Sequence, residues 1–201
     1  MPGVSPVRCF GDGDALYAGY HDHEWGRPVL EEGRMLELLC LEGFQAGLSW
    51  LTVLRRRETL RRALCGFAPA ALAALGPADL DRLMTDPGVI RHRAKLEAAV
   101  ANARAALALA AAGEGLVPLV WSFRPPSTPP AADWSGVPAE SAESSALARE
   151  LRRRGFRFVG PTTAQALLQA AGVVNDHLAA CPVRAEVEAE RRRALARLRL
   201  G

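Results

Sequence analysis

Helical spacing of apolar residues is the feature that most constrains the fold of this chain. Leucines recur three positions apart within residues 36–39 and 48–54, and an alanine-rich run of the same kind begins at His92 and stops at Gly113. Residues three or four positions apart share one face of an α-helix, whereas the strict alternation typical of strands is nearly absent here. The sequence therefore predicts an all-α protein.

Proline and glycine mark where these helices begin and end. Pro69 and Pro77 stand at the first positions of two short helical stretches, and Gly155 closes a helix that follows the proline-rich residues 124–138. Because proline removes backbone donors, that segment is predicted to be a loop between two helical groups. We expect one helical domain over residues 1–185, followed by an Arg-, Ala- and Glu-rich tail over residues 186–201 that forms a further helix.

Composition excludes several classes of protein. With 201 residues, of which 49% are hydrophobic, the chain can bury a sizeable core. No apolar run approaches the roughly 18 residues of a membrane span, and the first residues lack the pattern of a secretory signal. Four scattered cysteines do not make a disulfide scaffold. We expect a soluble, cytoplasmic protein that acts as a monomer and does not bind membranes; the net charge of +3 says little about partners.

The stretch "RRGFRFVGPTTAQALLQAAG" predicts two helices joined by a hairpin over residues 156–160. Pro161 starts the second helix, whose first amides, near Thr162 and Thr163, have no acceptors within the helix and suit a phosphate. Gly160 allows a backbone to approach closely. Taken alone, the Gly-Pro pair favours an ordinary tight turn between helices.

Two pairs of soft ligands stand near opposite ends of the sequence. Cys9 precedes His21 by twelve positions, and His177 precedes Cys181 by four, a spacing that shares one face if the segment is helical. Together they would make a Cys2His2 set suited to tetrahedral Zn²⁺, with no position left for water, and hence a structural site. From spacing alone, a buried core imidazole and a small buried thiol are the better interpretation.

The other cysteines and histidines carry no such pattern. Cys40 and Cys65 have no histidine at ligand spacing and are expected to fill the core, while His23 and His92 are expected to face solvent or cap a helix.

Aromatic residues gather near one carboxylate. Only 6% of the chain is aromatic, yet one window of 34 residues contains Glu42 together with Tyr17, Tyr20, Trp25, Phe44 and Trp50. Core filling explains any single aromatic residue. Glu42 is harder to explain, because it lies in the apolar stretch "LLCLEGFQAGLSW", where a carboxylate is costly unless it meets a partner or a cationic ligand.

Several strings in order resemble the DNA-3-methyladenine glycosylase I family, a branch of the helix-hairpin-helix DNA glycosylases. They are "YHDHEWG", "CLEGFQAGLSWLTVLRRRE", "GVIRHRAKLEAAVANARA", "LVWSF", "RRGFRFVG" and "VNDHLAAC", and they cover roughly residues 8–181. The resemblance implies a helix-hairpin-helix bundle in which a structural zinc joins the N- and C-terminal segments. It also places the zinc ligands at Cys9, His21, His177 and Cys181.

The same resemblance assigns roles to the aromatic window. Glu42 would contact the base and be the catalytic residue, Tyr20 would stack or hydrogen-bond, and Trp50 would stack. Trp25 and Tyr17 would line the same cavity. The turn with Gly47 and Leu48 would probe the gap left in DNA by an extruded nucleotide, and the hairpin glycine would grip a phosphate.

The implied activity is that of a monofunctional glycosylase, which hydrolyses the N-glycosidic bond of 3-methyladenine in double-stranded DNA and leaves an abasic site. Such a base is cationic while attached to the sugar, so a carboxylate and electron-rich rings select it over neutral adenine. It is also a good leaving group already. The only lysine, Lys95, lies away from the hairpin in sequence, which argues against a lyase step.

Two departures from the family pattern bear on this expectation. Asn175 stands where the superfamily has an aspartate, and an amide can neither deprotonate water nor offset an oxocarbenium charge. Phe10 and Gly11 follow Cys9 where the family usually has a tryptophan, so one pocket wall is altered. Two alternatives remain open: a non-catalytic zinc-containing protein that binds damaged DNA, and a glycosylase with shifted alkylpurine specificity.

Overall fold

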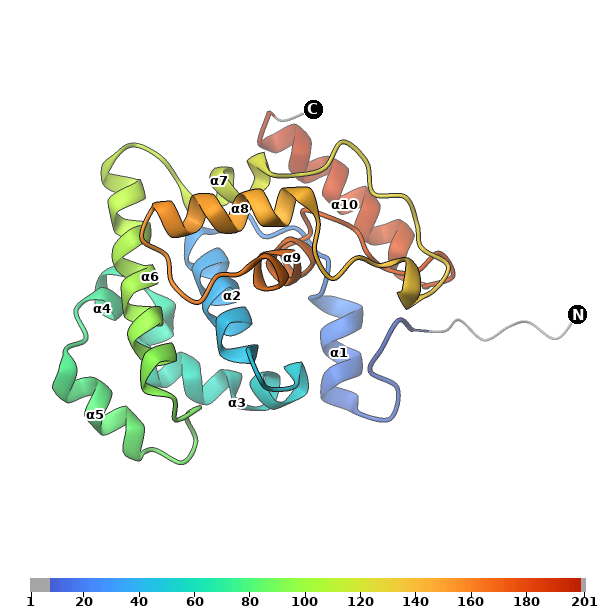
Figure 1. The fold of residues 1–201 in the computed structure, drawn as a ribbon. Coiled ribbons are helices and arrows are strands. Elements are labelled where there is room, and N and C mark those ends of the chain that lie inside the picture. Colours follow the sequence, from blue (N-terminus) through green and yellow to red (C-terminus); the bar gives the residue numbers. More distant parts are fainter. Residues whose placement is uncertain (1–7, 200–201) are drawn as a thin grey trace, which may run out of the picture.

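The structure, a computed structural model, describes residues 8–199, and within them the chain is built from helices alone (Figure 1). Ten α-helices and two short 3₁₀ turns follow one another, and no strand occurs in this range. The all-α class predicted from apolar spacing is therefore confirmed.

Two helical groups are separated by an irregular segment, as the prolines predict. The first group consists of α1 (Ala15–His23), α2 (Glu32–Gln45), α3 (Trp50–Ala63), η1 (Cys65–Phe67), α4 (Pro69–Ala73), α5 (Pro77–Thr85), α6 (Arg93–Ala111) and α7 (Leu116–Ser122). Residues 123–141 contain only the short turn η2 (Trp134–Gly136). They lead to α8 (Ala142–Arg153), α9 (Pro161–Ala170) and α10 (Arg184–Arg197).

Helix α2 forms the centre of the core. Every residue from Met35 to Phe44 is buried, so this helix has no solvent-facing side over that stretch. It packs against α3, α6, α7 and α9, which surround it in Figure 1. A helix that is enclosed on all sides must place its few polar side chains in cavities or against partners, and this applies to Glu42.

Side-chain caps fix where several helices start. Ser49 accepts a hydrogen bond from the Thr52 amide at the start of α3, and Ser141 does the same for Ser144 in α8. Glu32 accepts bonds from the amides of Leu116 and Val117, which satisfies the first turn of α7 from a neighbouring helix. The Glu32 contacts therefore tie the start of α2 to the start of α7.

The last helix packs onto the segment that follows α1. Arg27 forms ion pairs with Glu186 and Glu190 of α10, at 3.0 and 2.5 Å. Val187 and Ala194 on the same helix are buried. The two ends of the described chain therefore share contacts, while the expected division into a domain over residues 1–185 and a tail over residues 186–201 stays a prediction.

Two further features concern single elements. Cys65 is exposed and has a φ of 55°, so the expectation that it fills the core is wrong: it lies in the tight turn η1, whose backbone turns its side chain outward. In the range that the structure covers, no single helix has the length and apolarity of a membrane span, although α6 and α7, bent by 92° at their junction, pass that test as a pair.

Candidate functional site

Glu42 lies in the last turns of α2 and is only 5% exposed. Its carboxyl group lines a cavity of about 300 Å³, whose other walls are the residues after α2 and the first turns of α9. None of the described residues donates a hydrogen bond to it, and burial raises its pKa to about 8. A buried carboxyl group without a partner that faces a cavity is prepared for a cationic ligand.

Two tyrosines and Trp50 lie on the same side of α2 as this carboxyl group. Burial, and after it the charge of Glu42, raises the pKa of both Tyr17 and Tyr20. The ring centroids of Tyr20 and Trp50 are 5.3 Å apart. The buried indole nitrogen of Trp50 has no hydrogen-bond partner within the described part of the chain, which leaves it free to donate to a ligand. The structure thus brings together Glu42, both tyrosines and Trp50.

The ring of Trp25 packs against other rings. Its nearest ring neighbours are His177, at 4.5 Å, and Phe10, at 5.0 Å, measured between centroids. Phe10 in turn stacks near Tyr17 at 4.7 Å, so Trp25 is connected to the tyrosines through Phe10. Its assignment to the same cavity as Glu42 stays a prediction. Tyr17, Tyr20 and Trp50 are, like Trp25, not among the residues that line the 300 Å³ cavity.

The residues after α2 form a tight turn at the mouth of the cavity. The Leu48 amide donates to the Gln45 carbonyl at 2.7 Å, and Gly47 has a φ of 78°. Ala46, with φ −49° and ψ 116°, completes the pattern of a type II β-turn, in which glycine is the natural third residue. Leu48 is 40% exposed on this 45–48 turn, an apolar side chain presented to solvent beside the cavity.

The hairpin, residues 156–160, lines a second hollow together with Ala46 of this turn. It connects α8 to α9, which pack against each other, and it leaves Phe158 38% exposed. Gly160 is the N-cap of α9 and no side chain caps that helix, so its first amides remain available. Thr163 lines both the cavity and the hollow beside the hairpin, whereas the Thr162 hydroxyl donates to Glu140 at 2.6 Å.

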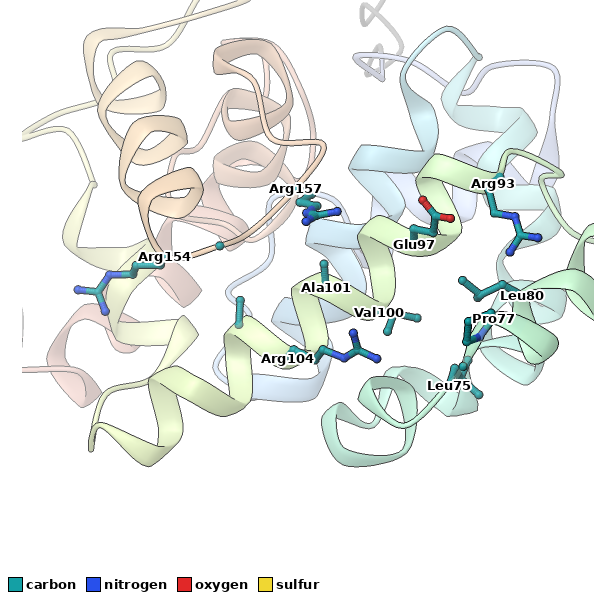
Figure 2. A pocket seen from close by; sticks show the side chains of 13 residues that line it. Leu75, Pro77, Leu80, Arg93, Glu97, Val100, Ala101, Arg104, Arg154 and Arg157 are labelled. Carbon is teal, nitrogen blue, oxygen red and sulfur yellow. The ribbon is translucent and has the colours of Figure 1, made fainter.

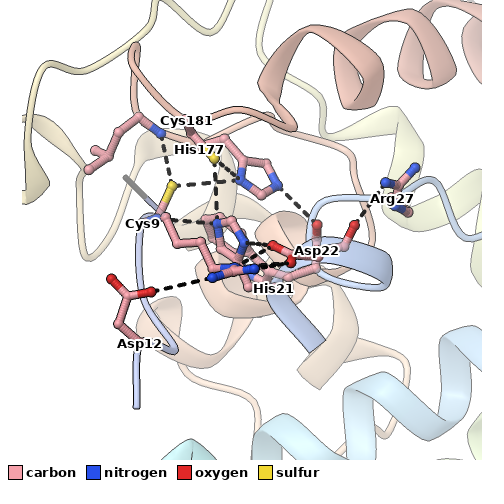
Figure 3. Close-up of polar contacts among 10 residues, drawn as sticks. Cys9, Asp12, His21, Asp22, Arg27, His177 and Cys181 are labelled. Carbon is pink, nitrogen blue, oxygen red and sulfur yellow. Dashed lines mark hydrogen bonds and ion pairs between the residues drawn. The ribbon is translucent and has the colours of Figure 1, made fainter. Parts of the chain in front are cut away.

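The four predicted metal ligands meet in one buried cluster (Figure 3). The ligand atoms of Cys9, His21, His177 and Cys181 all lie within 4.8 Å of one another. The Cys181 sulfur lies 3.3 Å from His177 Nδ1 and 3.5 Å from His21 Nε2. Such spacing fits four ligands around one small ion, so the Cys/His cluster could bind a metal.

Outer contacts orient both imidazoles toward this cluster. His21 Nδ1 lies 2.8 Å from the Asp22 carboxylate, which Arg8 holds with two nitrogens at 2.8 to 3.0 Å. His177 Nε2 lies 3.1 Å from the Trp25 carbonyl. In each case one ring nitrogen is bonded outward, so the other points into the cluster, as second-sphere partners do at metal sites.

The electrostatics of the cluster also fit a cation. Burial lowers the pKa of His177 to about 4, so the ring is neutral, the form that ligates. Burial raises the pKa of the Cys9 thiol to about 12, so a thiolate at that position requires a positive charge nearby.

The segment that supplies His177 and Cys181 is not helical. Both lie in the irregular stretch between α9 and α10, and the Cys181 amide donates to the Leu178 carbonyl in a turn. The idea that a helix places these two ligands on one face is therefore wrong. Arg184 replaces the helix as the local support, because its guanidinium donates to the carbonyls of Asn175 and His177.

Asn175 serves this same segment. It is fully buried, and its amide nitrogen lies 3.2 Å from both the Arg184 carbonyl and a Glu188 oxygen. The position at which the superfamily has an aspartate thus anchors the start of α10 in this chain.

A larger hollow than the Glu42 cavity lies elsewhere. It measures about 520 Å³, runs between α5 and α6 beside the hairpin, and shares no residue with the Glu42 cavity (Figure 2). Two of its arginines are already neutralised, Arg93 by Asp81 and Arg154 by Glu114 and Glu150. It contains neither a buried carboxyl group nor an aromatic ring, so volume alone does not make it the candidate site.

Several residues in these surroundings were missed by sequence reasoning. Trp134, from the proline-rich segment, donates its indole hydrogen to the Cys9 carbonyl at 2.8 Å. Lys95 and Asn102 of α6 contact the turn and the hairpin. Only Lys95 had a signal, as the one lysine in a chain that otherwise uses arginine.

Comparisons with known proteins agree with this arrangement. A family model described as methyladenine glycosylase matches residues 10–185. DNA-3-methyladenine glycosylase 1 of Escherichia coli (strain K12) is 45% identical over 170 residues, 84% of this chain and 91% of that protein. DNA-3-methyladenine glycosylase of Haemophilus influenzae is 45% identical over 179 residues, 88% of this chain and 97% of that protein.

A solved structure extends the likeness to three dimensions. It describes 3-methyladenine recognition by 3-methyladenine DNA glycosylase I from Staphylococcus aureus, and it matches with a TM-score of 0.85 at 36% identity. The match covers 90% of this chain and 98% of that one.

Proposed function

The chain belongs to the methyladenine glycosylase family, and from this premise we propose that it is a monofunctional DNA glycosylase acting in base excision repair. It hydrolyses the N-glycosidic bond of 3-methyladenine in alkylated double-stranded DNA and leaves an abasic site. The observation that carries the proposal is the buried carboxyl group of Glu42, which faces a cavity between the 45–48 turn and the first turns of α9.

Glu42 discriminates by charge. With a pKa of about 8 it is mostly protonated at neutral pH, because burial disfavours the carboxylate. A cationic base that enters the cavity offsets this penalty and favours the ionised form, whereas neutral adenine does not. Tyr20 and Trp50 add electron-rich faces and a free indole donor on the same side.

Bond cleavage then needs modest help from the protein. The bond between the sugar carbon and the base nitrogen breaks, and its electron pair neutralises the cationic ring, which leaves as uncharged 3-methyladenine. Water adds to the sugar carbon and loses a proton, so the products are free base and an abasic site. The carboxylate of Glu42 holds the base while this charge is redistributed.

DNA is held at two places beside the cavity. Leu48, on its turn, is presented to fill the gap left by the extruded nucleotide, and the first amides of α9 after Gly160 face a backbone phosphate. Gly47 permits the turn, and Thr163 lies between the two places. The Thr162 hydroxyl is bonded to Glu140, so only its amide serves the phosphate.

For the Cys/His cluster the proposal is one structural Zn²⁺. Two sulfur and two nitrogen donors match its preference, and four protein ligands leave no position for a reacting water. Zinc would hold Cys9 and His21 to His177 and Cys181, and no step of the reaction passes through it. We further propose that the protein acts in the cytoplasm as a monomer.

Release of free bases from methylated duplex DNA tests the function. Purified protein should release 3-methyladenine much faster than 7-methylguanine and should not cut the strand, because hydrolysis needs no Schiff base. Strong release of 7-methylguanine supports a glycosylase of shifted specificity, for which the altered wall at Phe10 is the structural reason. Binding of methylated DNA without release of any base would identify a damage-binding protein and overturn the proposal.

A further inference from the structure

Helix α6 is the only helix that holds both DNA-facing loops through buried polar side chains among the residues described. Its motif "GVIRHRAKLEAAVANARA" is left unexplained by the base pocket and the metal cluster. Lys95, in its first turn, is 6% exposed, and Asn102 is 2% exposed. They are seven residues apart, so they share one face of the helix about 10 Å apart along its axis.

Lys95 holds the 45–48 turn. Its ammonium group donates to the Phe44 carbonyl at 2.9 Å and also to the Ala46 carbonyl. These are the carbonyls at the end of α2, where the helix dipole is negative and acceptors lack partners within the helix. No described carboxylate pairs with this lysine, and burial lowers its pKa. The partners of this buried ammonium group are therefore backbone carbonyls of one short segment.

Asn102 holds the hairpin in a similar way. Its side-chain oxygen accepts from the Arg157 amide at 2.7 Å, and its side-chain nitrogen donates to the Arg157 carbonyl at 3.3 Å. Both backbone groups of one hairpin residue are therefore fixed by one side chain. Figure 2 shows Arg157 lying over α6, beside Ala101. Near the start of α6, the His92 ring meets the exposed ring of Phe158 at 6.0 Å.

We propose that Lys95 and Asn102 are positioning residues that set the spacing between the 45–48 turn and the hairpin when the protein grips a damaged duplex. This inference rests on the proposed function of those two loops. In a damaged duplex, the distance between a backbone phosphate and the gap left by the extruded nucleotide is fixed. Two irregular loops can match that distance only when their backbones are bonded to a rigid element. Helix α6, with 19 residues, is that element.

The two residues have different expected signatures in DNA binding. Lys95→Met keeps the length of the side chain but releases the turn, so it should weaken binding to a duplex with an abasic-site analogue about tenfold while binding to undamaged duplex changes little. Asn102→Leu releases the hairpin, which grips phosphate whether or not damage is present. It should weaken binding to both duplexes alike.

Arg191→Met is the matched control. Arg191 is 7% exposed and donates to the Val173 carbonyl at 2.8 Å, so it is also a buried cation bonded to backbone, although it differs from Lys95 in having a carboxylate, Glu188, at 3.5 Å. It lies on α10, at the opposite side of the molecule from α6 in Figure 1. Its loss should lower the melting temperature while the ratio of the two duplex affinities stays at the parental value.

Two readouts separate positioning from general damage to the fold. Affinity for free 3-methyladenine should fall less than affinity for the abasic duplex in Lys95→Met, because the 45–48 turn forms only one wall of the base cavity. In a Leu48→Ala background, Lys95→Met should weaken abasic-site binding little further, because the lysine acts through that turn. Asn102→Leu should keep its full effect in the same background.

The outcomes are decisive in either direction. If Lys95→Met keeps the parental ratio of abasic to undamaged affinity, or loses free-base affinity in equal measure, the lysine only supports the fold and the proposal is wrong. If one variant fails to fold, the affinities of the other variant for abasic and undamaged duplex still test the role of its residue. Binding needs no turnover, so a parent protein that binds abasic DNA but releases no base overturns the proposed function and leaves this test intact.

Discussion

At the scale of single residues, the candidate site depends on one carboxyl group, which burial keeps uncharged. Glu42 has neither a basic partner nor a hydrogen-bond donor in the described chain, and its pKa of about 8 follows from burial alone. Its position in an apolar stretch of sequence predicts that it needs a ligand. Trp134 could not be found in the same way, because only the fold brings the proline-rich segment against the residues around Cys9.

The raised pKa of Glu42 makes stability depend on pH. Between the usual value of 4.5 and about 8, the folded chain keeps a proton that the unfolded chain has lost. Stability therefore falls as pH rises through this window, by up to about 1.4 kcal/mol per pH unit. Glu42→Gln removes that slope.

Urea denaturation of the parent and of Glu42→Gln, at several pH values from about 5 to about 8, measures how the two unfolding free energies differ. This range covers most of the interval between the usual pKa of Glu42 and its raised pKa. The variant should gain stability over the parent as pH rises, and the two should converge toward pH 5. A parent whose stability relative to the variant does not change over this range would show that Glu42 is ionised and solvated.

At the scale of elements, local sequence signals predict the helices better than the segments between them. Pro69, Pro77 and Pro161 each begin a helix, and Ser49 and Ser141 cap two more. Spacing alone does not show whether His177 and Cys181 lie on a helix. They do not, because the chain between α9 and α10 is held by Arg184 rather than by its own helical hydrogen bonds.

The 45–48 turn allows a test of one element. Gly47 has a φ of 78°, and a side chain there would meet no atom within 4 Å, so the backbone conformation alone disfavours other residues. Gly47→Ala should cost about 1 kcal/mol of unfolding free energy. It should also weaken abasic-site binding, since the turn presents Leu48.

Gly33→Ala is the control for this substitution. Gly33 is inside α2, also has open space around its Cα, and has no positive φ. Alanine there should leave stability unchanged or raise it by up to about 1 kcal/mol. Equal losses in the two variants, measured by urea denaturation, would contradict the role of the turn conformation.

At the scale of the whole molecule, the Cys/His cluster joins segments that are far apart in the chain. Cys9 and His177 are 168 positions apart, and no local pattern indicates that they meet. The resemblance to a known family supplied that pairing, and the folded chain gives it a geometry with oriented imidazoles. The ion pairs of Arg27 with α10 reinforce the same closure.

Removal of one ligand tests this closure. Cys181→Ala should abolish stoichiometric zinc and lower the melting temperature, because ligand binding to the folded state contributes directly to stability. Cys40→Ala is the control: this thiol is equally buried but lies outside the cluster, so zinc content should stay at the parental value while core packing is weakened. Metal analysis of both variants measures the zinc bound per chain. A Cys181→Ala protein with the parental zinc content would show that the Cys/His cluster is not the zinc site.

The central claim is that the carboxyl group of Glu42 selects a base by its positive charge. Single-turnover release of 3-methyladenine from methylated duplex DNA, compared between the parent and Glu42→Gln at saturating protein, tests it most directly. The amide keeps the shape of the side chain but cannot become anionic, so release should fall about 100-fold while the variant stays folded. Release at the parental rate by a folded Glu42→Gln protein would contradict the account.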